Sequence, residues 1–276
     1  MVHRTIEIGG RRLGIRTTSR AFGAWIDETF PEHLVGGEPE MYDYSVVVDG
    51  GDGAESDRRG TRFHILYYGV GAVIRTMHLP ELGRSLVAEL EGWALKERTD
   101  RIFVHAAAVA MDGISILVPA WLVAYLGDLG RRIERAQLRL PIARWSAVDP
   151  ESGSLVPPPP IVDVPKRAFD DLERLQVPNG RGPTRVEDDA ERRVDAVLTY
   201  DPALDTIAPG PRGIALHRIV SQTANLGALG GDALAGLGEL VRGARSYETG
   251  LGRKAQMLEA LLAVVGHERA HREASS

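Results

Sequence analysis

The clearest catalytic spacing in the sequence is His267-Glu268-Arg269-Ala270-His271, which matches the pattern HExxH. On a helix, two histidines with this spacing bind zinc, and the glutamate acts as the general base of a metallopeptidase. The pattern marks a site only where a third ligand and a surrounding cleft accompany it. No further histidine follows His271, and we therefore interpret the segment as a solvated helix end without a metal.

A second spacing, Gly250-Leu251-Gly252-Arg253-Lys254, has part of the composition of a phosphate-binding loop. Such a loop reads GxxxxGK followed by Ser or Thr. Its backbone N–H groups surround the phosphates, the lysine contacts the outer phosphates and the hydroxyl holds Mg²⁺. Neither the spacing nor a following hydroxyl residue is present here. The other two lysines, Lys96 and Lys166, lie outside any glycine loop, so the sequence provides no phosphate-binding loop.

The composition excludes several other classes of site. The chain has no cysteine, which excludes disulfides, thiolate catalysis and cysteine-based metal sites. Its 276 residues are 43% hydrophobic and 26% charged, as in soluble globular proteins. The formal net charge of −5 gives no basic field that would attract nucleic acid. The most apolar run, residues 114–126, is shorter than the roughly 20 residues that span a bilayer. We expect a cytoplasmic protein that binds neither nucleic acid nor membrane.

The first 100 residues are predicted to form a lead-in region of mixed α and β structure. Strands at residues 5–8 and 12–16 flank Gly9-Gly10, which predicts a hairpin. Ser19 is a candidate cap for a helix over residues 19–30, and apolar spacing predicts an amphipathic helix over residues 79–96. Further strands are expected at residues 44–48, 62–68 and 72–77, with a polar loop at residues 50–60.

The main core is predicted over residues 101–266, followed by a flexible tail at residues 267–276. Two apolar runs flank Met111-Asp112-Gly113, and an Asp-Gly turn in this position predicts a buried hairpin. The four prolines at residues 157–160 favour an extended polyproline segment. The remaining expected elements are helices at residues 121–138, 231–243 and 253–265, strands at residues 146–149 and 214–221, and a polar loop at residues 178–193.

The order of these elements resembles a known family. The segments Val104-His105-Ala106-Ala107-Ala108-Val109, Asp112-Gly113 and Ile116-Leu117-Val118-Pro119 are similar to HPr-kinase-related proteins, which often occur in gene clusters for ribosomally made, modified peptides. Order and spacing carry the resemblance over most of the chain. It implies an α/β fold with α+β character in the N-terminal half and an HPr-kinase/PEP-carboxykinase-like, P-loop-type core.

The sequence departs from that family directly after Pro119, where the family's phosphate loop would begin. The first glycine of the motif is Ala120, the second is Tyr125, the lysine is Leu126 and the hydroxyl residue is Gly127. The side chains of Trp121, Leu122, Tyr125 and Leu126 are instead expected to pack a hydrophobic helix onto the sheet. Tyr125 and Trp121 would also obstruct a phosphate at the helix start. The resemblance therefore implies a degenerate member without its phosphate loop.

The family's metal-binding acids are missing as well. No Asp or Glu occurs between Glu134 and Asp149, where the acidic pair would lie. Because Mg²⁺ and the phosphate loop act as one clamp on the transferring group, their joint loss argues against phosphoryl transfer. His105 is the remaining polar residue of the family motif. It is either a relic that faces a partner or a structural histidine bonded to backbone, and we favour the structural interpretation. We expect no cofactor and no metal.

These observations favour a catalytically inactive pseudokinase that acts as a binding or scaffold accessory protein. The resemblance implies a role in the biosynthesis of ribosomal peptide natural products. A peptide or protein partner is expected to dock on residues 157–160 or, preferably, on residues 44–96. Homo-oligomer formation stays open. One alternative is an enzyme with a rebuilt site for an anionic or peptide substrate, held by Arg131, Arg132, Arg135 and Arg139. Another is a structural or regulatory subunit outside any peptide pathway.

Overall fold

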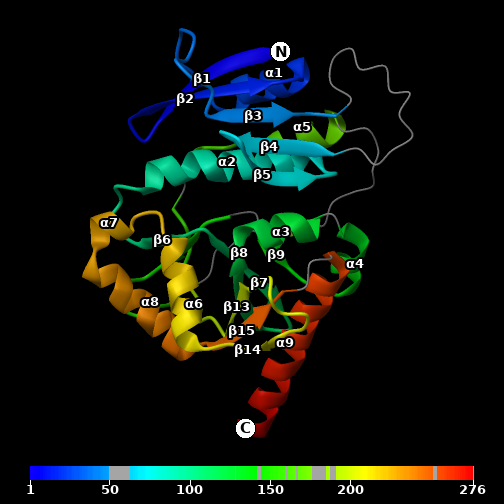
Figure 1. The fold of residues 1–276 in the computed structure, drawn as a ribbon, viewed down its shortest axis with the longest axis vertical. Helices are drawn as coiled ribbons and strands as arrows, with labels where there is room; N and C mark the ends of the chain where they lie inside the picture. Colours follow the sequence, from blue (N-terminus) through cyan, green and yellow to red (C-terminus); the bar gives the residue numbers. More distant parts are fainter. Residues whose placement is uncertain are drawn as a thin grey trace. The chain divides into compact units, whose positions relative to one another are not determined.

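The computed structural model describes residues 1–49, 63–127, 129–141, 144–159, 161–165, 167–175, 185–186, 191–250 and 254–275. The described chain divides into two compact units (Figure 1). Among the described residues, unit 1 contains residues 1–49, 63–94, 161–165 and 167–175. Unit 2 contains the rest, from Leu95 onward.

Unit 1 is built around a five-stranded sheet in the order β1-β2-β3-β4-β5. The strands are β1 (Val2–Ile8), β2 (Arg11–Thr17), β3 (Tyr44–Val47), β4 (His64–Tyr68) and β5 (Gly71–Thr76). β2 and β3 run parallel, and the other neighbouring pairs run antiparallel. The turn between β1 and β2 places Gly9 and Gly10 at positive φ, which glycine adopts without steric cost.

Three helices pack on one face of the unit 1 sheet: α1 (Arg20–Thr29), α2 (Leu79–Leu95) and α5 (Ala168–Leu175). Ser19 caps α1 by accepting a hydrogen bond from the N–H of Phe22. The indole of Trp25 on α1 donates to the carbonyl of Ala168 at 2.8 Å. This bond and the burial of Leu172 in the shared core explain why α5 belongs to unit 1, although it is distant in sequence.

Unit 2 contains a second five-stranded sheet, in the order β14-β15-β13-β8-β7. Its central strands β15 (Arg245–Thr249), β13 (Ala196–Tyr200) and β8 (Ile114–Pro119) are parallel. The edge strands β14 (Ala208–Pro209) and β7 (Ala106–Met111) are antiparallel to their neighbours. Two small sheets accompany it. One joins β11 (Leu155–Val156), β10 (Ser146–Val148) and β6 (Ile102–Val104), and the other joins β12 (Arg185–Val186) and β9 (Leu140–Pro141).

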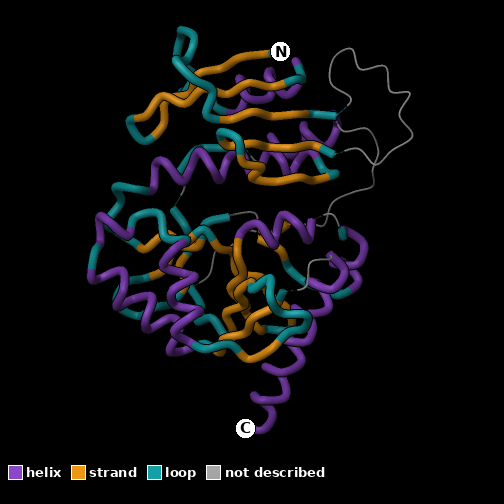
Figure 2. Tube along the Cα trace, in the orientation of Figure 1, coloured by secondary structure: helices purple, strands orange, loops and turns teal. Residues whose placement is uncertain are grey.

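Helices cover both faces of the large sheet in unit 2 (Figure 2). One apolar cluster includes α3 (Ala120–Gly127), α4 (Gly130–Arg135) and α9 (Lys254–Ser275). The other includes α6 (Arg212–Ser221) and α8 (Gly231–Gly243), beside the short α7 (Leu226–Leu229). Because neither face meets water, the strands are buried residue after residue and show no alternation.

The mixed α/β content confirms the predicted fold class at this coarse level. The N-terminal hairpin, the helix capped by Ser19, the amphipathic helix α2 and the helix α8 lie where the sequence predicted them. The Asp-Gly hairpin between β7 and β8 is also confirmed, with Asp112 and Gly113 both at positive φ. In these elements the local turn chemistry and the hydrophobic spacing agree with the final fold.

Two predicted elements are wrong. Residues 214–221 were expected as a strand because they contain β-branched residues, but they form α6, in which Ala215 and Ile219 are buried one helical turn apart. The single helix expected over residues 121–138 is two helices, α3 and α4, which end and begin at Gly127 and Gly130. The structure also adds the parallel strands β13 and β15, which the sequence analysis did not identify.

Segment boundaries differ from the expected ones in two further ways. The division between the units falls after Ala94 in place of residue 100, and α5 returns to unit 1. The predicted flexible tail at residues 267–276 is helical through Ser275. The predicted loop at residues 50–60, most of the loop at residues 178–193 and Pro160 lie outside the described residues. Within the described ranges, no helix combines the length and apolarity needed to cross a membrane.

Candidate functional site

The junction between β8 and α3 occupies the place where the resemblance puts a phosphate loop. β8 ends at Pro119 and α3 begins at Ala120, so no loop residue separates the strand from the helix. The N–H of Ala120 donates to the carbonyl of His105 at 3.3 Å. A phosphate loop, in contrast, directs a series of backbone N–H groups at the anion. Residues 119–127 therefore form a packed strand-to-helix connection without a phosphate cradle.

The four positions that the resemblance aligns with a phosphate-loop motif lie along α3. Ala120 and Leu126 are buried, Tyr125 is partly buried, and Gly127 is the last residue of the helix. Leu126 belongs to the core beneath α3, as expected for a hydrophobic helix on a sheet. Trp121 does not share this packing, because 41% of its surface is exposed. The prediction that Trp121 packs onto the sheet together with Leu122, Tyr125 and Leu126 is therefore wrong for Trp121.

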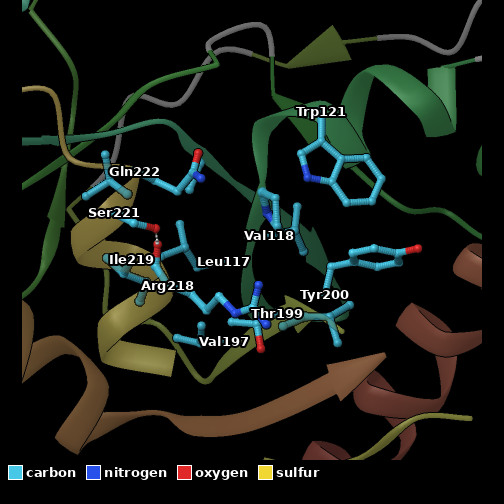
Figure 3. Close-up of a pocket in the computed structure, with 14 residues that line it drawn as sticks. Leu117, Val118, Trp121, Val197, Thr199, Tyr200, Arg218, Ile219, Ser221 and Gln222 are labelled. Atoms are coloured by element: carbon cyan, nitrogen blue, oxygen red, sulfur yellow. Dashed lines mark hydrogen bonds between the residues drawn. The ribbon is translucent and has the colours of Figure 1, made fainter. Parts of the chain in front are cut away.

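Trp121 and Tyr200 form an aromatic pair at the end of the parallel strands (Figure 3). Their ring centroids are 5.3 Å apart with an interplanar angle of 84°, whereas the Trp121–Tyr125 centroids are 6.4 Å apart. An edge-to-face arrangement places the positive edge of one ring against the negative face of the other. The pair fixes the position of Trp121 while leaving much of its indole accessible.

A pocket of about 170 Å³ opens beside this pair, at the carboxyl ends of β8 and β13. Its floor is apolar and consists of buried side chains, namely Val104, Ala106, Leu117 and Val197. In open sheets with parallel strands, ligands bind outside the carboxyl ends of the strands. The position of this pocket is therefore the one at which a protein with this sheet topology binds its ligands.

The polar part of the pocket rim comes from the end of α6. Arg218, Ser221 and Gln222 line it, and all three are exposed. The hydroxyl of Ser221 donates to the carbonyl of Arg218 at 2.7 Å, and this bond closes the last turn of the helix. The guanidinium of Arg218 forms no ion pair or hydrogen bond with any residue in the described part of the chain. Among the described residues, the rim thus carries one positive charge that has no carboxylate partner.

His105 contributes to this region through its backbone. Its N–H donates to the carbonyl of Gln222 at 2.8 Å, and its carbonyl accepts the bond from Ala120. The imidazole stacks on buried Trp145, with ring centroids 4.6 Å apart and an interplanar angle of 29°. Burial, together with the positive charge of Arg144, lowers the pKa of His105 to about 4. The ring is neutral at neutral pH and lies outside the residues that line the pocket.

The HExxH segment has a structural role in α9. Tyr247 on β15 donates a hydrogen bond to a carboxylate oxygen of Glu268 at 2.8 Å, and Arg245 lies 3.9 Å from the same carboxylate. The ring of His267 stacks on Tyr247, with centroids 6.1 Å apart. Glu268 is only 5% exposed, and its contacts hold α9 against β15. Among the described residues, no three His, Asp or Glu side chains gather at a position that could hold a metal.

The arginines proposed for a rebuilt enzyme site do not meet at the pocket. Arg131, Arg132 and Arg135 lie on α4 and are exposed, and the backbone of Arg139 pairs with Ala110. None of them lines the pocket at the strand ends. The other predicted sequence feature, Gly250 to Lys254, includes residues 251–253, which lie outside the described part of the chain.

Sequence reasoning missed the residues that build the pocket rim. Arg218 was placed in a predicted strand, and Tyr200 ends a strand that was not predicted. The available signal in the sequence was the helical spacing of the apolar residues Ala215 and Ile219, which are buried in the structure. In a helix this spacing leaves Arg218 at the edge of the apolar face.

Comparison with known proteins adds no assignment, since no family model, curated protein or solved structure matches the chain.

Proposed function

We propose that this protein is a catalytically inactive relative of the HPr-kinase-like proteins, with a P-loop-type core that has lost its phosphate loop. It acts as a binding or scaffold accessory protein for a peptide or protein partner. The resemblance in sequence suggests a place in the assembly of ribosomally made, modified peptides. In this role the fold supplies surfaces and a pocket, and no phosphoryl group is transferred.

One observation carries the proposal, namely the direct connection of β8 to α3 at Pro119 and Ala120. Phosphoryl transfer depends on backbone N–H groups, a lysine and Mg²⁺ that act together on the transferring group. Here the helix start is tied to His105, and the position of the lysine holds the buried Leu126. A nucleotide phosphate at the end of β8 would therefore meet neither a loop of backbone N–H groups nor a lysine.

The sheet of unit 1 offers a surface for a partner. β5 forms one edge of this sheet, so one side of its backbone is not paired with another strand of the sheet. An extended peptide can add to such an edge through main-chain hydrogen bonds. β5 lies within residues 44–96, the region that the sequence favoured for docking. We propose this edge as the attachment point of the scaffolding function.

Calorimetry with ATP and Mg²⁺ tests the loss of phosphoryl transfer. We expect no heat of binding in the micromolar range, because the phosphate cradle is missing and not merely covered. The Trp121→Ala variant is the matched control: removing the exposed indole should not restore binding. A dissociation constant near 1 μM for either protein, equivalent to about −8 kcal/mol, would contradict the proposal.

Affinity purification of the full-length protein from its host tests the scaffolding role. We expect a peptide or protein to co-purify, and cross-linking followed by mass spectrometry should place its contacts within residues 44–96. Recovery of the protein alone, with no metabolite changed when its gene is deleted, would refute the scaffold. Cross-links confined to other residues would refute the docking surface while leaving the scaffold in place.

A further inference from the structure

We infer that the pocket of unit 2 binds the last residue of a peptide, with its side chain on the apolar floor and its terminal carboxylate on Arg218. This inference rests on the proposed binding function and names the ligand of the same protein. The ligand class is an organic carboxylate that carries one aromatic ring or one branched aliphatic group. The size of the pocket, its floor and its charge each restrict the ligand to this class.

The size of the pocket limits the ligand to one side chain. Its volume is about 170 Å³. An engineered cavity of about 150 Å³ in another protein binds benzene, whereas pockets for drug-sized ligands measure roughly 300–1,000 Å³. A single ring or branched chain therefore fills the pocket, and the rest of a longer ligand lies outside it.

The floor of the pocket selects an apolar group. Val104, Ala106, Leu117 and Val197 are buried and come from four different strands. A side chain placed on them is removed from water without leaving a buried polar group unpaired. Trp121, held by its contact with Tyr200, provides a wall against which a ring can stack.

The charge on the rim selects an anion. Arg218 extends along the pocket in Figure 3, and within the described chain its guanidinium has no carboxylate partner. A guanidinium presents two parallel N–H donors that match the two oxygens of a carboxylate. The side chain of Gln222 lies on the same rim and adds an amide that can bond a peptide group.

The same geometry explains why we assign binding and not hydrolysis. Ser221 and Thr199 both line the pocket, and their hydroxyls donate to the carbonyls of Arg218 and Tyr247. A hydrolytic serine needs a general base within hydrogen-bond reach. The nearby imidazole of His105 stacks on Trp145 and does not line the pocket. A peptide end bound here would be held unchanged.

Calorimetry with three matched probes tests the inference on the full-length protein. The probes are N-acetyl-L-phenylalanine, its C-terminal amide, and the peptide N-acetyl-Gly-Gly-Phe with a free carboxylate. We expect both free acids to bind, the peptide at least as tightly as the single residue, and the amide roughly tenfold more weakly, because it lacks the charged partner of Arg218. Quenching of tryptophan fluorescence gives a second readout, and because the chain has four tryptophans, the part of the quenching that Trp121→Ala removes is assigned to Trp121.

Arg218→Gln and Arg212→Gln form a matched pair of variants. Both arginines are exposed on α6, but only Arg218 lines the pocket. Arg218→Gln should remove the preference for acid over amide, whereas Arg212→Gln should keep it. Thermal melts of both variants verify that they fold, and the exposure of both side chains predicts melting temperatures close to that of the wild type.

Each contrary result has a separate meaning. Equal binding of acid and amide, or unchanged acid binding in Arg218→Gln, overturns the carboxylate assignment. Binding of N-acetyl-L-phenylalanine without the tripeptide overturns the peptide end as its source. If no probe binds while a partner still co-purifies, the pocket inference fails and the scaffold stands. ATP binding, in contrast, would remove the proposed function itself.

Discussion

The two units of the molecule use five-stranded sheets in different ways. In unit 1, helices pack on one face, and β3 alternates between the buried Tyr44 and Val46 and the less buried Ser45 and Val47. In unit 2, helices cover both faces, and the residues of β8 and β13 are buried almost without interruption. In a sheet with helices on one face, an edge strand can accept a partner, whereas a sheet covered on both faces is accessible at the ends of its strands.

This difference assigns the two units different kinds of ligand. The edge of β5 suits an extended chain that is recognised through its backbone. The pocket beyond β8 and β13 suits a single chain end that is recognised through its side chain and its charge. Four experiments test whether the two units differ in stability and in ligand binding as their architectures indicate. They are given from the largest expected effect to the smallest.

The largest effect is expected from truncating the core of either unit. Phe22 in unit 1 and Leu261 in unit 2 are both completely buried. Phe22→Ala should cost about 3–5 kcal/mol and Leu261→Ala about 2–5 kcal/mol in the free energy of unfolding. Because each unit has its own core, each variant should shift a different transition in calorimetry. A single transition that both variants shift equally would show that the units unfold as one.

The second effect depends on pH. Burial lowers the pKa of His64 in unit 1 to about 4, with His78 adding to this shift and Asp49 opposing it. The unfolded chain has the ordinary value near 6.5 and therefore binds an extra proton between about pH 6.5 and 4. Stability should fall as the pH decreases through this window, by up to roughly 3 kcal/mol from this group.

The pH effect is measured by urea unfolding at pH 7, 5.5 and 4.5. Burial raises the pKa of Glu91 to about 8, which changes stability in the opposite sense. The wild type is therefore compared with His64→Gln, which cannot take up the proton. The wild type should lose more stability than the variant on acidification. Parallel pH profiles would show that His64 does not carry this coupling.

The third effect concerns Glu268, which accepts the hydrogen bond of Tyr247 on β15. Glu268→Ala leaves this hydroxyl without its acceptor and should cost about 1–3 kcal/mol in a thermal or urea melt. The control is Glu273→Ala, a change at an exposed position of the same helix that should have little effect. If zinc raised the melting temperature of the wild type but not of Glu268→Ala, the HExxH segment would be a metal site after all.

The smallest effect on stability is expected for Trp121→Ala. With 41% of its surface exposed, Trp121 should contribute at most about 1 kcal/mol to folding. Its neighbour Leu122 is 2% exposed, so Leu122→Ala should cost about 2–5 kcal/mol. Binding of N-acetyl-L-phenylalanine should nevertheless weaken in the tryptophan variant. A large loss of stability in Trp121→Ala would indicate that Trp121 is part of the core, and this would contradict its assignment as a wall of the pocket.

Local signals in the sequence predicted much of the fold. The glycine pair at Gly9, the Asp112-Gly113 turn and the cap at Ser19 each act through neighbouring backbone atoms, and each is present in the structure. The strand β13 escaped prediction because a strand buried on both faces has no alternation to recognise. α6 was mistaken for a strand because its β-branched residues outweighed the helical spacing of its two buried positions.

The pocket could be predicted only in part, because its residues are far apart in sequence. The segment around His105 and the missing motif at Ala120 were singled out from the sequence. Their relation to Arg218 depends on the pairing of strands and helices across the sheet. Likewise, nothing local connects His105 to Trp145, on which its ring stacks. Long-range contacts of this kind arise from topology, and the pattern of one segment does not contain them.

The peptide unit of His105 has a consequence for measurements on this protein. Its N–H bonds to the carbonyl of Gln222 after α6, and its carbonyl accepts the N–H of Ala120 at the start of α3. His105 is thus hydrogen-bonded to the end of α6 and to the start of α3, which lie on opposite sides of the pocket. Occupancy of the pocket should steady both bonds, so the amide hydrogens of His105 and Ala120 should exchange with deuterium more slowly when a ligand is present. These two amides would report binding without any label or change in the sequence.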